Sequence, residues 1–178
     1  MPDAFEELLR QAQRARRENR PADAKRDLEQ ALEMARNSAP ASDLARALAG
    51  LGQIERDLGN HAAALGLYQQ AALIYRGEAD PLRLAHTVRH VGDIRQDLRQ
   101  FDLAEPCYRE ALDIYRAHPE TPMLDLANAI RGLALLKSET GERVEARALW
   151  QEARDLYAAV NVEAGVKEST RRLGLLTG

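Results

Sequence analysis

The sequence predicts an all-α protein built from helix pairs that stack on one another. Three observations lead to this prediction: a segment of 26 residues recurs at offsets of 40 and 42 residues, proline recurs at a spacing of 41, and small residues recur at fixed positions within the copies. Repetition at such a period is typical of arrays in which each unit packs against its neighbours. We therefore expect about nine helices in a single domain that spans residues 1–178.

Three strong copies of the repeat align with one another. They are LGQIERDLGNHAAALGLYQQAALIYR (51–76), VGDIRQDLRQFDLAEPCYREALDIYR (91–116) and LALLKSETGERVEARALWQEARDLYA (133–158). A weaker copy covers residues 11–36, where Gln11 and Arg14 stand in place of Leu51 and Ile54. Polar residues at these positions are expected at the end of an array, where one face meets water.

Glycine and proline divide each copy into two helices. Gly59 lies midway through its copy, where one helix ends and the chain turns back. Asp80-Pro81 and Thr121-Pro122 each predict a capping residue followed by proline at the first helical position, where its missing N–H has no helical partner. The expected helices are 3–18, 22–37, 43–58, 61–77, 81–98, 101–117, 122–139, 142–160 and 162–176. The corresponding hairpins are about 3–37, 43–77, 81–117 and 122–160, with a C-terminal capping helix at about 162–176.

Small residues at equivalent positions predict a close approach of helix backbones. Gly52, Gly92 and Ala134 occupy one position on the first helix of each pair. Glycine inside a helix costs about 1 kcal/mol relative to alanine, so its recurrence indicates a packing requirement. Large side chains recur at neighbouring positions and are expected to fill the core: Tyr68, Tyr75, Tyr108, Tyr115, Trp150 and Tyr157.

This set of residues resembles the tetratricopeptide repeat family. The resemblance rests on LG (51–52), VG (91–92), Gly59, Ala64 and Tyr68, with their downstream counterparts. The period of about 41 residues and the stretch AEPCYREAL look most like the longer subclass found in kinesin light chains and many bacterial repeat proteins. The resemblance implies a right-handed superhelical solenoid of antiparallel helix hairpins.

The resemblance also implies a function. In this family the first helix of each pair lines a concave groove that binds a peptide segment or helix of a partner protein, without catalysis. Carried over by position, the groove residues are Arg46, Gln53, Arg56, His86, Arg89, Asp93, Asn128, Arg131, Leu135 and Arg171. Chaperone-binding members hold a C-terminal carboxylate with asparagine and lysine; Gln53 and Asp93 stand where such asparagines would be, so that partner is not expected. The alternatives are self-association as a scaffold, including a homodimer, and the sensor or interaction domain of a larger signalling or transcriptional regulator.

A ladder of arginine residues indicates a partner with acidic groups. Arg89, Arg131 and Arg171 occupy equivalent positions on successive first helices. Asp93 and Glu168, at helical spacing, are expected to neutralise the first and the last of them. Arg131 has no acidic residue three or four positions away, so we expect it to contact an acidic side chain or C-terminal carboxylate of the partner.

Other classes of site find little support. His86, His90 and Asp93 have a spacing that can hold a metal, but no further cysteine or histidine matches it, so we expect no metal. Cys107 has no cation placed to stabilise a thiolate, and a half-buried, unreactive side chain is expected. Catalytic and phosphate-binding motifs were not found, so neither enzymatic activity nor a cofactor is expected.

Charge and composition argue against nucleic acid and membranes as partners. The net charge is −3, and six of the eight aromatic residues fall in core positions, which leaves no stacking platform for bases. The chain shows no secretion signal and no run of about 18 apolar residues. Together with a single cysteine, these features lead us to expect a cytoplasmic protein.

Overall fold

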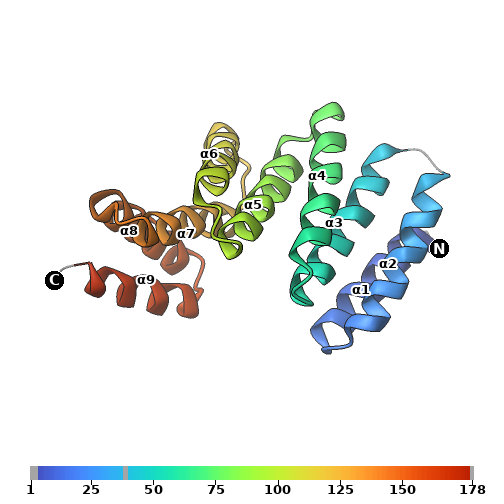
Figure 1. The fold of residues 1–178 in the computed structure, drawn as a ribbon, viewed down its shortest axis with the longest axis horizontal. Coiled ribbons are helices and arrows are strands. Elements are labelled where there is room, and N and C mark those ends of the chain that lie inside the picture. Colours follow the sequence, from blue (N-terminus) through green and yellow to red (C-terminus); the bar gives the residue numbers. More distant parts are fainter. Residues whose placement is uncertain (1–3, 38–39, 177–178) are drawn as a thin grey trace. The chain divides into compact units, whose positions relative to one another are not determined.

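The computed structural model describes residues 4–37 and 40–176 of the chain. Within these ranges it consists of nine α-helices and contains no strand (Figure 1). They are α1 (Ala4–Arg17), α2 (Pro21–Arg36), α3 (Ala41–Asp57), α4 (His61–Gly77), α5 (Pro81–Asp97), α6 (Phe101–Ala117), α7 (Met123–Glu139), α8 (Arg143–Ala159) and α9 (Glu163–Leu175). The all-α class is confirmed; residue 3, the expected start of the first helix, lies outside the described residues.

The chain divides into two compact units, Met1–Thr87 and Val88–Gly178, and the boundary falls within α5. In the first unit α1 packs on α2, α2 on α3 and α3 on α4. In the second unit α6 packs on α7, α7 on α8 and α8 on α9. Each unit is thus built from sequential helix packing, as expected for a repeat array. The single domain stays a prediction.

Residues with a positive φ lie in the turns that follow several of the helices. Gly59 and Gly141 have φ of +80° and +86°, and a Cβ built on either would meet nothing within 4 Å. Glycine is favoured at both positions because of the positive φ, and not because neighbouring atoms leave no room for a side chain. Arg99, which stands at the same place in its hairpin, has φ of +59°, a conformation that costs an L-residue about 1–2 kcal/mol.

Only one of the two predicted proline caps is correct. Pro81 begins α5, and the carboxylate of Asp80 accepts a hydrogen bond of 3.1 Å from the backbone N–H of Arg83. The Thr121-Pro122 prediction is wrong: α7 begins one residue later, at Met123, and no side chain caps it. Instead, the Thr121 hydroxyl donates to the backbone carbonyl of Tyr115, at 2.9 Å. The hydroxyl that was expected to cap the start of α7 therefore satisfies a carbonyl near the end of α6, which has no partner within its helix.

The aromatic side chains form the core, as predicted. Each is at most 3% exposed: Tyr68, Tyr75, Tyr108, Tyr115, Trp150 and Tyr157. Phe5, which had no assigned core position, is also buried, against Ala31 and Ala47.

Glycine makes room for these rings. A Cβ on Gly52 would lie 3.0 Å from the ring of Tyr68, and a Cβ on Gly92 would lie 3.2 Å from Tyr108. A Cβ on Gly132 would lie only 2.4 Å from the same Tyr108 ring. The Tyr108 ring is therefore held between a glycine of α5, in its own hairpin, and a glycine of α7, in the next hairpin.

Candidate peptide-binding surface

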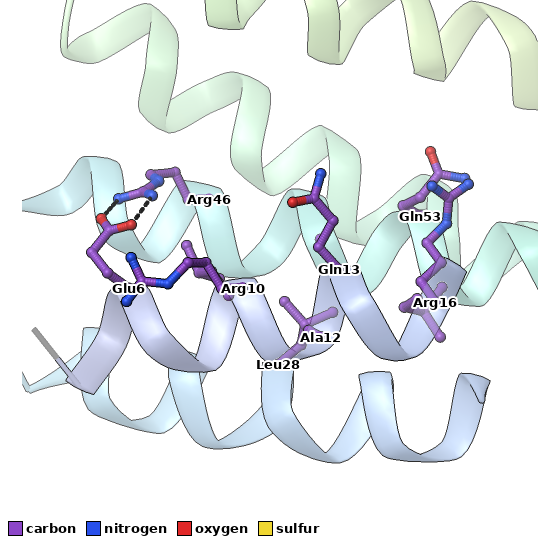
Figure 2. Close-up of a pocket in the computed structure, with 11 residues that line it drawn as sticks. Glu6, Arg10, Ala12, Gln13, Arg16, Leu28, Arg46 and Gln53 are labelled. Atoms are coloured by element: carbon purple, nitrogen blue, oxygen red, sulfur yellow. Dashed lines mark hydrogen bonds and ion pairs between the residues drawn. The ribbon is translucent and has the colours of Figure 1, made fainter. Parts of the chain in front are cut away.

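A pocket lies between α1 and α3 in the first unit (Figure 2). Its volume is about 370 Å³. The lining residues are Glu6, Leu9, Arg10, Ala12, Gln13, Arg16, Leu28, Arg46, Gly50, Gln53 and Ile54. Two of the predicted groove residues, Arg46 and Gln53, are among them.

The floor of the pocket is made of apolar side chains, and Gly50 of α3 leaves room for one of them, Leu28 of α2. A Cβ on Gly50 would lie 2.6 Å from Cδ2 of Leu28, so only glycine leaves the leucine in its present position. Ala12, Leu28 and Ile54 are buried and belong to one hydrophobic cluster, and the partly buried Leu9 packs against it. The pocket therefore offers a small hydrophobic surface between two polar helix edges.

One end of the pocket is closed by a network around Arg46. Its guanidinium donates hydrogen bonds of 2.5 and 2.9 Å to the two carboxylate oxygens of Glu6 and one of 3.2 Å to Asp43. The same guanidinium lies 5.3 Å from the ring centroid of Phe5. Hydrogen bonding from Arg46 lowers the pKa of Glu6, which is therefore ionised at neutral pH. Arg46 is held in place and its charge is neutralised.

The other end of the pocket has a second arginine–carboxylate pair. Arg16 of α1 lies 2.5 Å from Asp57 of α3, and the amide of Gln53 donates to the same carboxylate at 2.8 Å. Gln53 also accepts a hydrogen bond of 3.2 Å from the hydroxyl of Tyr68. The predicted groove residue Gln53 thus has both ends of its amide engaged within the protein.

The remaining predicted residues of the first unit lie on the expected helices. Arg56 is partly buried in the last turn of α3, and His86 is exposed on α5.

In the second unit, the α5 residues of the predicted groove form a buried network. Arg89, 8% exposed, donates to Asp93 at 2.9 Å and lies 2.9 Å from Nε2 of His90. Because a guanidinium only donates, Nε2 of His90 is the acceptor of this contact. Asp93 also accepts a hydrogen bond of 2.8 Å from the hydroxyl of Tyr108, and the amide of Gln96 lies 2.9 Å from the same hydroxyl oxygen.

The expectation that Arg131 lacks a neutralising partner is wrong. Arg131 donates two hydrogen bonds, of 2.6 and 3.0 Å, to the carboxylate of Glu168 on α9. The expectation considered only residues of the same helix and assigned Glu168 to Arg171, whereas the packing of the hairpins brings the glutamate to α7. Arg171 is exposed.

The other two predicted groove residues of α7 are also engaged within the protein. Asn128 accepts a hydrogen bond of 2.8 Å from the hydroxyl of Tyr157 on α8, and Leu135 is partly buried. Three residues after Leu135, Ser138 accepts a hydrogen bond of 2.9 Å from the indole N–H of Trp150. Buried tyrosine and tryptophan need a partner for their polar end, so the recurring aromatic positions were a signal that first-helix polar residues would be used in this way.

Cys107 is half-buried, and its Sγ donates to the backbone carbonyl of Leu103 at 3.3 Å. Burial raises the pKa of the thiol, which keeps it protonated at neutral pH. Among the described residues, no helix is both long and apolar enough to cross a membrane.

The fold and the repeated contacts define a helical-repeat protein. Two family models, both described as tetratricopeptide repeat, match residues 44–77 and 83–159, which together exceed half of the chain. The chain belongs to the tetratricopeptide repeat family. No curated protein sequence matches it.

Several solved structures share the fold. BtubC (BKLC) from P. vanneervenii is 18% identical, with a TM-score of 0.74 over 97% of this chain and 81% of that chain. Aspartyl phosphate phosphatase F from Bacillus subtilis is 14% identical, with a TM-score of 0.87 over 99% of this chain and 46% of that chain. A Rap protein complexed with competence and sporulation factor is 14% identical, with a TM-score of 0.81 over 97% and 48%. The chain therefore spans about half the length of the last two, and such identities establish the fold alone.

Proposed function

We propose that this chain is a non-enzymatic protein-interaction module that binds a peptide segment of a cytoplasmic partner in the pocket between α1 and α3. The observation that carries the proposal is the pocket itself, with an apolar floor and polar edges contributed by the first helices of two hairpins. Small sites of this composition are typical of binding surfaces in which polar groups orient an apolar contact.

The similar structures support binding as the general role. One of them is a Rap protein complexed with competence and sporulation factor. We carry over only the capacity to hold a partner, because the sequences are 14% identical and this chain covers 48% of that one. The activity in the name of phosphatase F is not carried over, since the pocket is lined by arginine, glutamate, glutamine and apolar residues, with no histidine, cysteine or hydroxyl side chain among the lining residues described.

The dimensions of the pocket favour an extended segment. Along α3 the lining residues run from Arg46 to Ile54, a rise of about 12 Å at 1.5 Å per residue. An extended chain advances about 3.3 Å per residue, so roughly three to four residues of the partner span the pocket. A helical partner would need two full turns over the same distance.

The experiment is affinity capture from an extract of the native cells, with quantitative mass spectrometry and two matched variants. Gln13 is exposed at the edge of the pocket, and Gln13→Trp places a bulky ring across the pocket without touching the core. Gln70→Trp makes the same change on the exposed face of α4, away from the pocket. Melting curves confirm that both variants are folded.

We expect Gln13→Trp to lose specific partners that Gln70→Trp retains. An identical set of captured proteins for both variants contradicts binding in this pocket. Capture of the chain itself, with a concentration-dependent mass in light scattering, favours the alternative of self-association.

A further inference from the structure

We infer that the pocket between α1 and α3 takes one uncharged aliphatic side chain from an extended partner segment, and that it disfavours acidic residues. This inference rests on the proposed function and narrows it to a partner chemistry. It replaces the acidic partner that the arginine content of the groove suggested.

The first argument is the charge at the pocket. Three arginines line it, and each already holds a carboxylate of the same chain: Arg46 pairs with Glu6 and Asp43, Arg16 with Asp57, and Arg10 with Glu7, at 2.8 Å in the last case. Four carboxylates therefore surround three guanidinium groups. A partner carboxylate would have to displace one of them or lie beside like charges, whereas an uncharged segment leaves every pair intact.

The second argument is the floor. Leu9, Leu28 and Ile54 present only carbon to the pocket, and the missing side chain of Gly50 leaves the room that Leu28 occupies in the floor. The volume of about 370 Å³ is near the lower end of the range for ligand pockets, roughly 300–1,000 Å³. An aliphatic side chain with its flanking backbone suits this size, and burying it gains the hydrophobic contribution that a charged side chain lacks.

The third argument is the amide of Gln13. This side chain is exposed at the edge of the pocket and lies between the Arg46–Glu6 pair and Arg16 (Figure 2). An amide both donates and accepts hydrogen bonds, which matches the backbone of an extended peptide. The amide of Gln53 is already engaged by Asp57 and Tyr68. Gln13 thus supplies recognition of the backbone that does not depend on partner charge.

The test uses three capped pentapeptides, acetyl-Gly-Ser-X-Ser-Gly-amide, with X as leucine, glutamate or lysine. Each is titrated into the whole chain while the methyl resonances of Leu28 and Ile54 are followed by NMR. We expect the leucine peptide to give saturable shifts at these methyl groups, with an affinity about tenfold or more above that of the glutamate peptide. We also expect its affinity to change by less than about twofold when the salt concentration rises from about 20 to about 300 mM, because neutral contacts are not screened.

Three outcomes overturn the inference. They are equal or tighter binding of the glutamate or lysine peptide, a loss of leucine-peptide affinity of several-fold at high salt, and no saturable shift with the leucine peptide. Gln13→Trp should abolish the leucine-peptide shifts, and Gln70→Trp should leave them unchanged.

The two proposals can fail separately. If cellular partners are lost with Gln13→Trp but the leucine peptide does not bind, the proposed function stands and the partner chemistry is wrong. If the leucine peptide binds but capture is identical for both variants, the pocket chemistry stands and the proposed function is wrong.

Discussion

Arg131 of α7 and Glu168 of α9 form a two-hydrogen-bond ion pair, of 2.6 and 3.0 Å, across 37 positions of sequence. A similar pair, Arg46 with Glu6, links α3 to α1 in the first unit. In both units, an arginine on the first helix of a hairpin therefore holds a glutamate two helices away, on α1 in the first unit and on the C-terminal helix α9 in the second. Helices that are two apart in the chain are thus joined by an ion pair in each unit.

Reversing the charge at Arg131 should destabilise the protein rather than leave its folding intact. Arg131→Glu places two carboxylates face to face, so we expect a loss of about 1–2 kcal/mol in the free energy of unfolding, kept modest because the side chains are 39% and 22% exposed. The double variant Arg131→Glu/Glu168→Arg should recover most of this loss in urea unfolding. If the single variant is as stable as the parent, the pair contributes nothing to the fold.

The contribution of Glu168 should disappear at low pH. Burial alone would raise the pKa of its carboxyl, but the hydrogen bonds from Arg131 outweigh burial and hold the pKa below the ordinary value of 4.5. A pKa lowered by folding stabilises the protein above the unfolded pKa of about 4.3, and this stabilisation is lost as pH falls through the lower folded pKa. The stability difference between the parent and Glu168→Gln should be constant above about pH 5.5 and shrink below about pH 4.5. A difference that persists unchanged at pH 3 would contradict this linkage.

Three glycine-to-alanine substitutions should rank by the space around each position. Gly132→Ala should be the most destabilising, by about 1–3 kcal/mol, because its methyl group would lie 2.4 Å from the Tyr108 ring. Gly92→Ala should cost less, since the nearest atom is 3.2 Å away, and Gly92→Leu considerably more. Gly66 on α4 has open space around it, so Gly66→Ala should stabilise by up to about 1 kcal/mol through helix propensity. Thermal unfolding of the three variants gives the order, and a stabilised Gly132→Ala would refute the close packing of α6 on α7.

Lys137 should stabilise the second unit although it is a buried charged residue. It is 3% exposed, and its ammonium group lies 2.8 Å from Glu105 and 2.7 Å from Glu142, which ties α7 to α6 and to the start of α8. Burial lowers the pKa of Lys137, but the two carboxylates outweigh burial and raise it, so the group is charged at neutral pH. Lys137→Met should cost about 2 kcal/mol because Glu105 loses its buried partner. Lys167→Met, on an exposed side chain, is the matched control and should change the melting temperature little.

Much of the fold could be predicted because its causes are local or repeated. Gly59 and Gly141 end their helices through backbone angles that only nearby residues influence. The repeated tyrosine and tryptophan positions are buried because each of the three strong copies places them on the same helix face. The groove residues were placed on the correct helices for the same reason, since their spacing follows the helical period.

The sequence by itself determined the helices, their order and the core, because hydrophobic periodicity and turn residues act over a few positions. Only the tertiary structure decided which polar side chains are engaged: Glu168 lies three residues from Arg171 in sequence yet bonds Arg131. It also decided where the pocket floor lies, because Leu28 of α2 packs against Gly50 of α3 and both line the pocket. Such pairings depend on distances between helices, and a repeat period does not distinguish one neighbouring arginine or carboxylate from the next.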